Sequence, residues 1–271
     1  DHRDLHLSLR RQRQMCIRDR SRMWHSLKSI RNVIDLASFY KIKYLQLHLS
    51  DDQAFVFPTD SFPNLPTPDR PYSKQDFIEL VDYAKVRGIT IVPEIDVPGH
   101  SRQFIETYPE IFDVENGVKK SNVINIANEK VYSALDQIIG EVAQVFYNSP
   151  YIHMGADEAK LDLYKNVREV KSYMKKNNLG NDVHELYRYF IIRINEIVKS
   201  YDKQMLVWEG FRREGKIKIP KDIIVFEFET LYNHPKSLIE DGYTVVNTSW
   251  TPLYAVYGGV KNKAISDPWK A

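Results

Sequence analysis

The stretch Tyr151-Ile152-His153-Met154-Gly155-Ala156-Asp157-Glu158 decides the fold. Its first half is a short apolar run with one polar interruption, and it follows the turn signal Asn148-Ser149-Pro150. This pattern predicts a buried parallel strand rather than a helix. Two adjacent carboxylates come after the strand, at its carboxyl end, which is where α/β barrels carry their catalytic groups.

Asp157 and Glu158 are therefore the first candidates for catalysis. Adjacent residues at a strand end point in different directions, so the two can have different tasks. Two nearby carboxylates also repel each other, and one tends to keep its proton near neutral pH. The same pair would serve equally well as an acidic start of a helix running on from Ala159, where it suits the helix dipole.

The rest of the chain alternates strands with helices. Strands are expected at 44–49, 89–96, 151–154, 204–209, 223–228 and 243–248, with helices after Ser26 and Ser73, at 131–146, 161–176 and 183–199, and from Pro235. Single helical crossovers of this length imply a parallel sheet. Polar side chains gather just after the strands, which is typical of barrel enzymes. We therefore expect an α/β fold, a TIM (β/α)8 barrel.

Six strands are fewer than the eight of a closed barrel. Arg22 stands where the tail of a first strand is expected, and the chain stops at Ala271 before an eighth. The expectation is a partial barrel over residues 21–271, with the first strand overwritten and the eighth missing.

Residues 1–20 do not share the pattern of the rest. Asp1-His2-Arg3-Asp4-Leu5-His6 resembles the translated end of a short-read sequencing adapter, and residues 10–19 resemble the transposase read primer in the same frame. Residues 7–9 leave room for a library index. We interpret residues 1–20 as an artefact outside the structure, which implies that the native N-terminus is missing.

Composition supports a neutral globular domain once that piece is removed. Residues 1–20 carry six arginines, three aspartates and the only cysteine, and without them the formal net charge changes from +2 to −1. Nothing then indicates nucleic acid or an anionic membrane as a partner. No disulfide or zinc–thiolate site is available, and no apolar run reaches transmembrane length.

Three motifs resemble those of family 20 glycoside hydrolases, the β-N-acetylhexosaminidases. His153-Met154-Gly155-Ala156-Asp157-Glu158 is similar to that family's His-x-Gly-x-Asp-Glu signature. Pro93-Glu94-Ile95-Asp96-Val97-Pro98-Gly99-His100 and Leu47-His48-Leu49-Ser50-Asp51-Asp52-Gln53 resemble two further motifs, in the family's order. The resemblance covers roughly Ser21 to Tyr254.

The resemblance implies a retaining, substrate-assisted reaction without a cofactor. The 2-acetamido oxygen of the sugar attacks the anomeric carbon, in place of the nucleophilic carboxylate of most retaining glycosidases. Glu158 would be the acid and then the base, Asp157 would hold the acetamide N–H, and Tyr254 would donate to the acetamide oxygen. Without the resemblance, Tyr254 could equally be a barrel aromatic.

The other residues assigned to the substrate site are Arg22, Asp51, Asp96, His100, His153, Trp208 and Glu209. By resemblance Arg22 would meet sugar hydroxyls, Trp208 would form a pocket wall, and Asp96 and His100 would tune the acid. Each also has an ordinary structural interpretation, and His153 lies inside its strand. The sixth expected strand lacks the tryptophan common in the family, and Ala255-Val256 follows Tyr254 in place of Leu-Asp.

Two other functions remain open from the sequence. A metal-dependent barrel hydrolase or aldolase could draw ligands from the histidines and carboxylates, although no close His-x-His pair occurs. A non-catalytic glycan-binding module is the second. The family suggests a periplasmic or secreted protein acting on N-acetylhexosamine-terminated glycans, and the sequence indicates nothing about oligomeric state.

Overall fold

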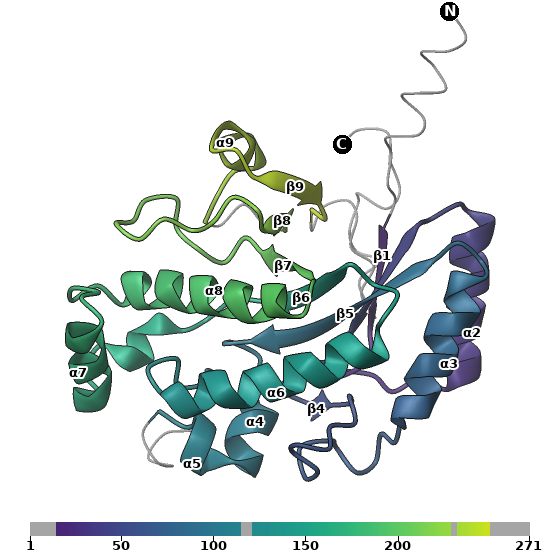
Figure 1. Cartoon of the computed structure of the whole chain (residues 1–271), viewed down its shortest axis with the longest axis horizontal. Helices are drawn as coiled ribbons and strands as arrows, with labels where there is room; N and C mark the ends of the chain where they lie inside the picture. The colour runs from purple at the N-terminus through teal and green to yellow at the C-terminus, as the bar shows by residue number, and fades with distance from the viewer. Residues whose placement is uncertain (1–14, 115–120, 229–231, 250–271) are drawn as a thin grey trace, which may run out of the picture.

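The computed structural model describes residues 15–114, 121–228 and 232–249 (Figure 1). Seven strands form one sheet in the order β1-β2-β5-β6-β7-β8-β9, and every pairing in it is parallel. The strands are β1 (Met15–Asp19), β2 (Tyr44–His48), β5 (Thr90–Val97), β6 (Tyr151–Gly155), β7 (Gln204–Trp208), β8 (Ile224–Glu227) and β9 (Thr244–Asn247). All six expected strands are confirmed, and the sheet is the curved half of a (β/α)8 barrel.

The first strand differs from the expectation. Residues 15–19 belong to the adapter-like stretch, yet they form β1 and pair with β2 from Met15↔Tyr44 to Asp19↔His48. Strand pairing needs only backbone groups and a suitable face, and Met15 and Ile17 supply apolar side chains that pack on the inner core. Arg20, directly after the strand, is buried, and its Nε and Nη1 have no hydrogen-bond partner among the described residues.

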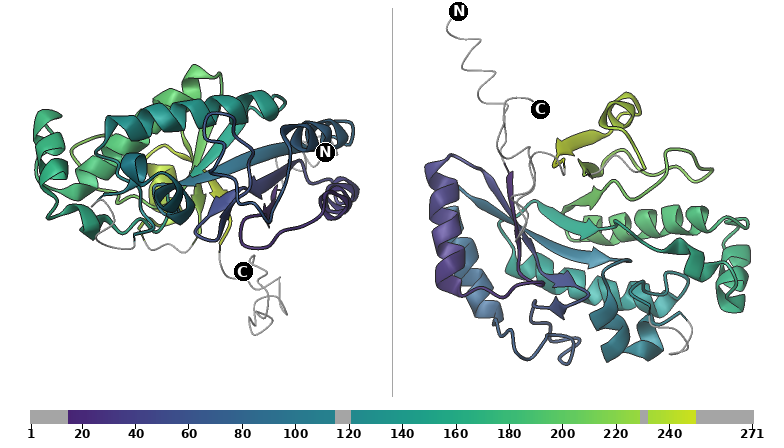
Figure 2. Two further views of the ribbon diagram at one scale, coloured as in Figure 1. Left: turned by 90° about the horizontal axis from the view of Figure 1, so that it is seen from below. Right: turned by 180° about the vertical axis from the view of Figure 1, so that it is seen from behind.

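Helices cover the outer face of the sheet. They are α2 (Leu27–Phe39), α3 (Lys74–Lys85), α4 (Arg102–Thr107), α5 (Pro109–Phe112), α6 (Glu129–Val145), α7 (Arg168–Lys176), α8 (Val183–Ser200) and α9 (Pro235–Glu240), with a short 3-10 helix η1 (Leu161–Tyr164). Helix α2 packs on α3, α3 on α6, and α6 on α8, so the layer follows the curve of the sheet (Figures 1 and 2). None of the helices described is both long and apolar enough to span a bilayer.

Two predicted helix starts, after Ser26 and Ser73, are confirmed by their caps. Ser26 accepts the backbone N–H of Ser29, and Ser73 forms a capping box with Asp76. Such caps satisfy N–H groups that have no partner within the helix, and each contributes about 1 kcal/mol. The helix expected at 161–176 is instead the 3-10 helix η1 followed by α7, which begins at Arg168.

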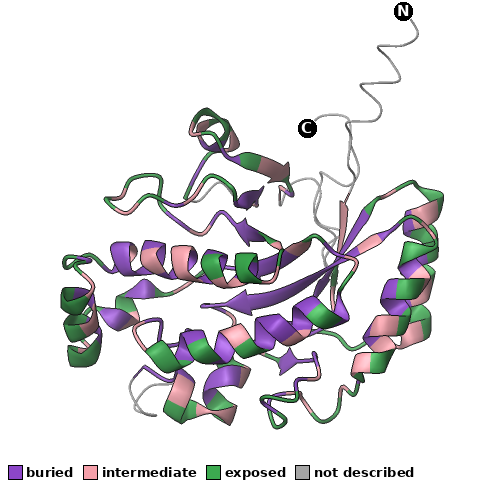
Figure 3. Ribbon diagram, viewed as in Figure 1, coloured by how far each residue is buried: buried purple, intermediate pink, exposed green. Residues whose placement is uncertain are grey.

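The core has two layers, because alternate residues of a strand point to opposite faces. Leu45 and Leu47 of β2 face the helices, in the large outer cluster. Leu206 and Trp208 of β7 point inward, in a smaller cluster that β8 and β1 complete. Both faces are buried, which explains why the central strands read as apolar runs (Figure 3). The polar residues on the inner face are the exception, and they form the site.

A two-stranded antiparallel ribbon, β3 (Ser50–Asp51) and β4 (Ala54–Phe55), follows β2 directly. It turns the chain back over the carboxyl end of the sheet, and the Ser50 hydroxyl accepts the backbone N–H of Asp96. The ribbon thereby places Asp51 beside the ends of β2 and β5.

Candidate active site

The inner face of the barrel carries polar side chains towards the carboxyl ends of four neighbouring strands. They are Gln46 and His48 from β2, Glu94 and Asp96 from β5, His153 from β6 and Trp208 from β7, and each is buried. The alternation of the strands puts them on one face. The parallel register puts His48, Glu94 and His153 at one level, with Gln46 two residues before that level and Asp96 and Trp208 two residues beyond it. Sequence-distant residues are thus brought together.

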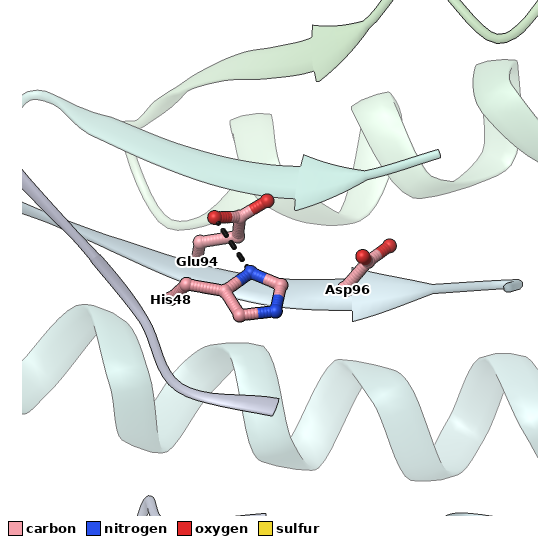
Figure 4. A group of neighbouring side chains, drawn as sticks. All are labelled: His48, Glu94 and Asp96. Atoms are coloured by element: carbon pink, nitrogen blue, oxygen red, sulfur yellow. Dashed lines mark ion pairs between the residues drawn. The ribbon is translucent and has the colours of Figure 1, made fainter. Parts of the chain in front are cut away.

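Glu94 is the residue of this group with the most contacts to the others, and Figure 4 shows its ion pair with His48. Gln46 Nε2 donates to its Oε2 over 2.8 Å, and Trp208 Nε1 donates to its Oε1 over 2.8 Å. His48 Nδ1 lies 2.9 Å from Oε2, and His153 Nδ1 lies 3.2 Å from Oε1. Although burial alone would favour the neutral acid, the two histidines hold the pKa of Glu94 well below its ordinary value.

Asp51 is a second buried carboxylate, and it joins three basic side chains. His48 Nε2 lies 3.0 Å from its Oδ2, Arg22 Nη2 lies 2.6 Å from the same atom, and His100 Nδ1 lies 3.4 Å from Oδ1. Burial opposes the charged form, but these partners outweigh it and lower the pKa of Asp51. Asp51 is therefore ionised throughout the physiological range.

His100 connects Asp51 to Asp157 and Glu158, the candidate catalytic pair. Its Nε2 lies 3.3 Å from Glu158 Oε2 and 3.7 Å from Asp157 Oδ2. Burial disfavours the imidazolium, but Asp51, Asp96 and Asp157 together raise the pKa of His100 to about 10. Glu158 is 56% exposed in its side chain, whereas His100 is 12% exposed. The carboxylate that faces solvent is thus backed by a buried cation and a buried anion.

Asp157 also lies near Asp96, and ligand atoms of the two carboxyl groups and of His100 are within 4.8 Å of one another. One oxygen of each carboxyl group, Oδ1 in both, is buried without a hydrogen-bond partner among the described residues. Burial raises the pKa of both groups, the charge of Asp157 adds to the shift of Asp96, and Glu94 adds to that of Asp157. The sequence suggested repulsion between Asp157 and Glu158; the structure adds Asp96 as a further carboxyl group close to Asp157.

The loop after β6 holds the catalytic pair in an unusual backbone shape. Ala156 has φ +73° and Glu158 has φ +47°, both in the left-handed region that non-glycine residues rarely adopt. Such strain persists only where the surroundings enforce it, and it is common at active sites. Here the buried Tyr187 hydroxyl of α8 donates to the Ala156 carbonyl, which fixes the residue directly before Asp157.

Glycines allow the neighbouring loops to approach this backbone. A Cβ at Gly210 would lie 1.8 Å from the Ala156 carbonyl oxygen, and one at Gly99 would lie 2.8 Å from the Asp157 carbonyl oxygen. Gly155, with φ +64°, leaves the space that the Asp96 carboxyl group occupies. Side chains at these positions would displace the loop that carries the pair.

The remaining predicted site residues lie at different depths. Trp208 contacts the rings of His153 and Phe226, with centroid distances of 4.9 and 5.5 Å. His153 has no exposed surface, and its Nδ1 also accepts the Gly155 N–H over 3.0 Å. Glu209 is buried and accepts the backbone N–H of Asn233. Tyr254 lies outside the described residues.

Sequence reasoning overlooked Glu94, Gln46 and Tyr187. Glu94 and Asp96 are two residues apart in a strand, so they share a face, and that alternation could have assigned Glu94 to the interior with Asp96. Gln46 precedes His48 by the same spacing. Tyr187 comes from a helix far along the chain, and nothing local indicates its hydrogen bond to Ala156.

Some of these groups could also hold a metal ion. His48, Glu94 and Asp96 have ligand atoms within 4.8 Å of one another, as do Asp96, His100 and Asp157. In the first group, however, His48 and Glu94 already contact each other at 2.9 Å, and both take further protein partners. In the first group the ligand atoms are therefore used in hydrogen bonds and ion pairs, so this group fits a charge-paired network better than a metal site. In the second group, Asp96 Oδ1 and Asp157 Oδ1 have no hydrogen-bond partner among the described residues.

Comparisons with known proteins agree on one family. The profile described as "Glycosyl hydrolase family 20, catalytic domain" matches residues 13–269. The β-hexosaminidase subunit A2 of Dictyostelium discoideum is 28% identical over 85% of this chain and 43% of that protein. The β-hexosaminidase subunit alpha of Bos taurus is 29% identical over 76% of the chain and 41% of that protein. The chain thus spans less than half the length of these relatives.

Solved structures show the same fold. The chitobiase of Flavobacterium johnsoniae is 27% identical with a TM-score of 0.78, over 87% of this chain and 38% of that one. The exo β-N-acetylglucosaminidase of Vibrio harveyi, solved with N-acetylglucosamine, is 25% identical with a TM-score of 0.75, over 87% of this chain and 40% of that one. With the profile match over most of its length, this chain belongs to glycosyl hydrolase family 20.

Proposed function

We propose that this chain carries the catalytic site of an exo-acting β-N-acetylhexosaminidase that removes terminal GlcNAc or GalNAc with retention, by a substrate-assisted reaction. The observation that carries the proposal is the division of labour between Glu158 and Asp157. One carboxylate is exposed and backed by His100, while the other is largely buried with an unpartnered oxygen. The relatives named above, all β-hexosaminidases or related glycosidases, support it.

Glu158 is the proton donor to the departing glycosidic oxygen. A general acid has to reach the substrate, and Glu158 is the more exposed of the pair. After the leaving group departs, the same carboxylate takes a proton from the incoming water. His100, held by Asp51, fixes the orientation of the Glu158 carboxyl group for both steps.

Asp157 holds the acetamido group. Its buried Oδ1 has no donor among the described residues, and the acetamide N–H of the sugar supplies one. When the acetamide oxygen attacks the anomeric carbon, positive charge develops on the nitrogen, and the Asp157 carboxylate stabilises it. The raised pKa of Asp157 in the free protein is offset at this stage, because a nearby positive charge favours the ionised form.

The remaining assignments are proposals of the same kind. Arg22, half exposed and anchored on Asp51, meets the sugar hydroxyls, and Trp208 forms the floor of the sugar pocket. Tyr254 would donate to the acetamide oxygen. The substrate is an N-acetylhexosamine-terminated glycan, and the proposed reaction uses no cofactor.

The test compares two aryl substrates, an N-acetyl-β-glucosaminide and the plain β-glucoside. Only the first carries the acetamide that the reaction needs, so we expect hydrolysis of the first alone, with a β-configured sugar as the initial product by NMR. Glu158→Gln should lower kcat by at least about 100-fold, whereas the exposed Glu169→Gln on α7 should leave it unchanged. Equal hydrolysis of both substrates would refute the proposal.

Two further measurements separate the alternatives. A metal-dependent hydrolase would lose activity with a chelator, and the proposed enzyme would not. A glycan-binding module would bind N-acetylglucosamine oligomers without hydrolysing them, and Glu158→Gln would leave its affinity unchanged.

A further inference from the structure

The buried interior holds an acid–base pair that the proposed chemistry does not use. His48 and Glu94 lie below the catalytic pair, and neither reaches the substrate side of the site: Glu94 has no exposed surface and His48 is 7% exposed. Buried charges of this kind are destabilising unless each is paired. The contacts of Glu94 and His48 determine the protonation state of each.

Glu94 can only be an ionised carboxylate. Gln46, Trp208 and His48 place nitrogen atoms 2.8–2.9 Å from its two oxygens. An ionised carboxylate can accept about four hydrogen bonds and has no hydrogen of its own, so it suits a site whose neighbours are donors. A protonated Glu94 would direct an O–H at one of them.

His48 lies between two carboxylates. Its Nδ1 is 2.9 Å from Glu94 Oε2 and its Nε2 is 3.0 Å from Asp51 Oδ2. A neutral imidazole carries one N–H, so its second nitrogen would face a carboxylate oxygen lone pair to lone pair. Asp51 is kept ionised by Arg22 at 2.6 Å, so the ring needs both protons.

We infer that Glu94 is a positioning residue, which holds His48 as an imidazolium and thereby fixes Asp51, the carboxylate that orients both Arg22 and His100. The contacts then run from the core to the solvent as an alternating series of acids and imidazoles, Glu94, His48, Asp51, His100 and Glu158. The link of this series to catalysis rests on the proposed function; the charge state of His48 does not.

The surroundings of His48 favour the charged ring on every side. The groups that face it are Glu94 and Asp96 from β5, Asp51 from β3 and Asp157 after β6; the cations Arg22 and His100 stand beyond Asp51, and His153 beyond Glu94. Burial opposes the imidazolium, yet Glu94 and Asp51 raise the pKa of His48 well above its ordinary value. The direction agrees with the geometry.

The experiment measures the protonation of His48 directly. The 15N shifts of its ring, in the full chain labelled at histidine, are followed from pH 5 to 9. In the wild-type protein both nitrogens should stay protonated throughout. A ring that titrates in this range would overturn the inference, whether or not the protein is active.

Two variants separate the charge of Glu94 from its packing. Glu94→Gln keeps the shape but removes the anion, so His48 should titrate between pH 5 and 9. Gln46→Leu removes a neighbouring donor and leaves the anion, so His48 should stay doubly protonated. If Glu94→Gln folds and its His48 does not titrate, Asp51 alone holds the ring and the inference is wrong. If Glu94→Gln does not fold, Asp51→Asn decides: Glu94 should keep His48 doubly protonated there, and a ring that titrates between pH 5 and 9 would overturn the inference.

Activity provides the link to catalysis. Glu94→Gln should lower kcat/KM roughly 10–100-fold, as loss of a supporting partner commonly does, and should add an ionisation to its pH profile at the His48 midpoint. A purely structural Glu94 would lower the melting temperature without that new ionisation. If the wild-type chain hydrolyses no glycoside, the proposed function fails while the His48 measurement still stands.

Discussion

Gly210 offers a direct test of how the catalytic loop is held. A methyl group at this position would lie 1.8 Å from the Ala156 carbonyl oxygen, and ordinary contacts begin at 3.4 Å. One of the two backbones must therefore move by roughly 1.6 Å. The same carbonyl accepts the buried Tyr187 hydroxyl, so its displacement also weakens that hydrogen bond.

The expected magnitude follows from these two effects. Overpacking of a closed contact costs about 1–3 kcal/mol, and a buried hydrogen bond contributes about 1 kcal/mol, so Gly210→Ala should lower the free energy of unfolding by about 2–4 kcal/mol. Asp157 follows Ala156 directly. Because a misplacement of about 1 Å can lower a rate about 100-fold, kcat/KM on the aryl N-acetyl-β-glucosaminide should fall by that order.

Gly180→Ala is the matched control. Gly180 has φ +73°, so alanine is strained there, but no atom of the described residues lies within 4 Å of the added methyl. It should cost about 1 kcal/mol of stability and leave activity unchanged. Urea unfolding and steady-state kinetics on the three proteins decide the matter. If Gly210→Ala behaves like Gly180→Ala, the close contact does not position the loop.

Three further predictions concern charge and the start of the chain. The pKa of His100 is about 10 in the folded protein and 6.5 in the unfolded chain, so its contribution to stability is complete below pH 6.5 and is lost as pH rises through 10. The free energy of unfolding should therefore fall by up to about 1.4 kcal/mol per pH unit between these values. His100→Gln should make this fall smaller. Burial alone would raise the pKa of Glu141, but the ion pair with Lys74 and the hydrogen bonds from Ser61 and the Asp60 backbone lower it to about 2. The contribution of Glu141 to stability is therefore complete above pH 4.5 and is lost as pH falls through 2. Glu141→Gln should reduce the loss of stability in acid, measured by urea unfolding between pH 5 and 2. We also propose that residues 1–20 derive from library DNA. The buried guanidinium of Arg20, with two nitrogens unpartnered among the described residues, supports a foreign residue at this position. Amplification from source DNA should give other codons before Ser21, and unbroken genomic reads through the codons of residues 1–20 would refute the proposal.

Local pattern was sufficient for most of the fold. The strand around His153 and the capping box at Ser73 are set by short-range properties, namely turn residues, apolar period and side-chain capping. These properties act within a few residues, so they can be identified without knowing what packs against them. Strand β1 was missed because residues 15–19 resemble translated adapter sequence, whereas pairing with β2 requires only a backbone and two inward apolar side chains.

The candidate site was also predictable from the sequence only in part. The chain order alone assigned Asp157, Glu158, Asp51, Asp96 and His100 to strand ends, because a motif after a strand keeps its place whatever the barrel around it does. It could not show that Asp157 comes close to Asp96, because that depends on how β5 and β6 pair and on the left-handed turn at Ala156.

The sequence by itself determined the family, the parallel sheet and which side chains stand at its carboxyl edge. Only the tertiary structure decided how those charges are partnered, with Glu94 at the centre and Asp51 shared by three basic groups. The physical reason is that pairing energy depends on distances of about 3 Å between atoms from several strands, together with the removal of water around them. Neither quantity exists until the strands are side by side.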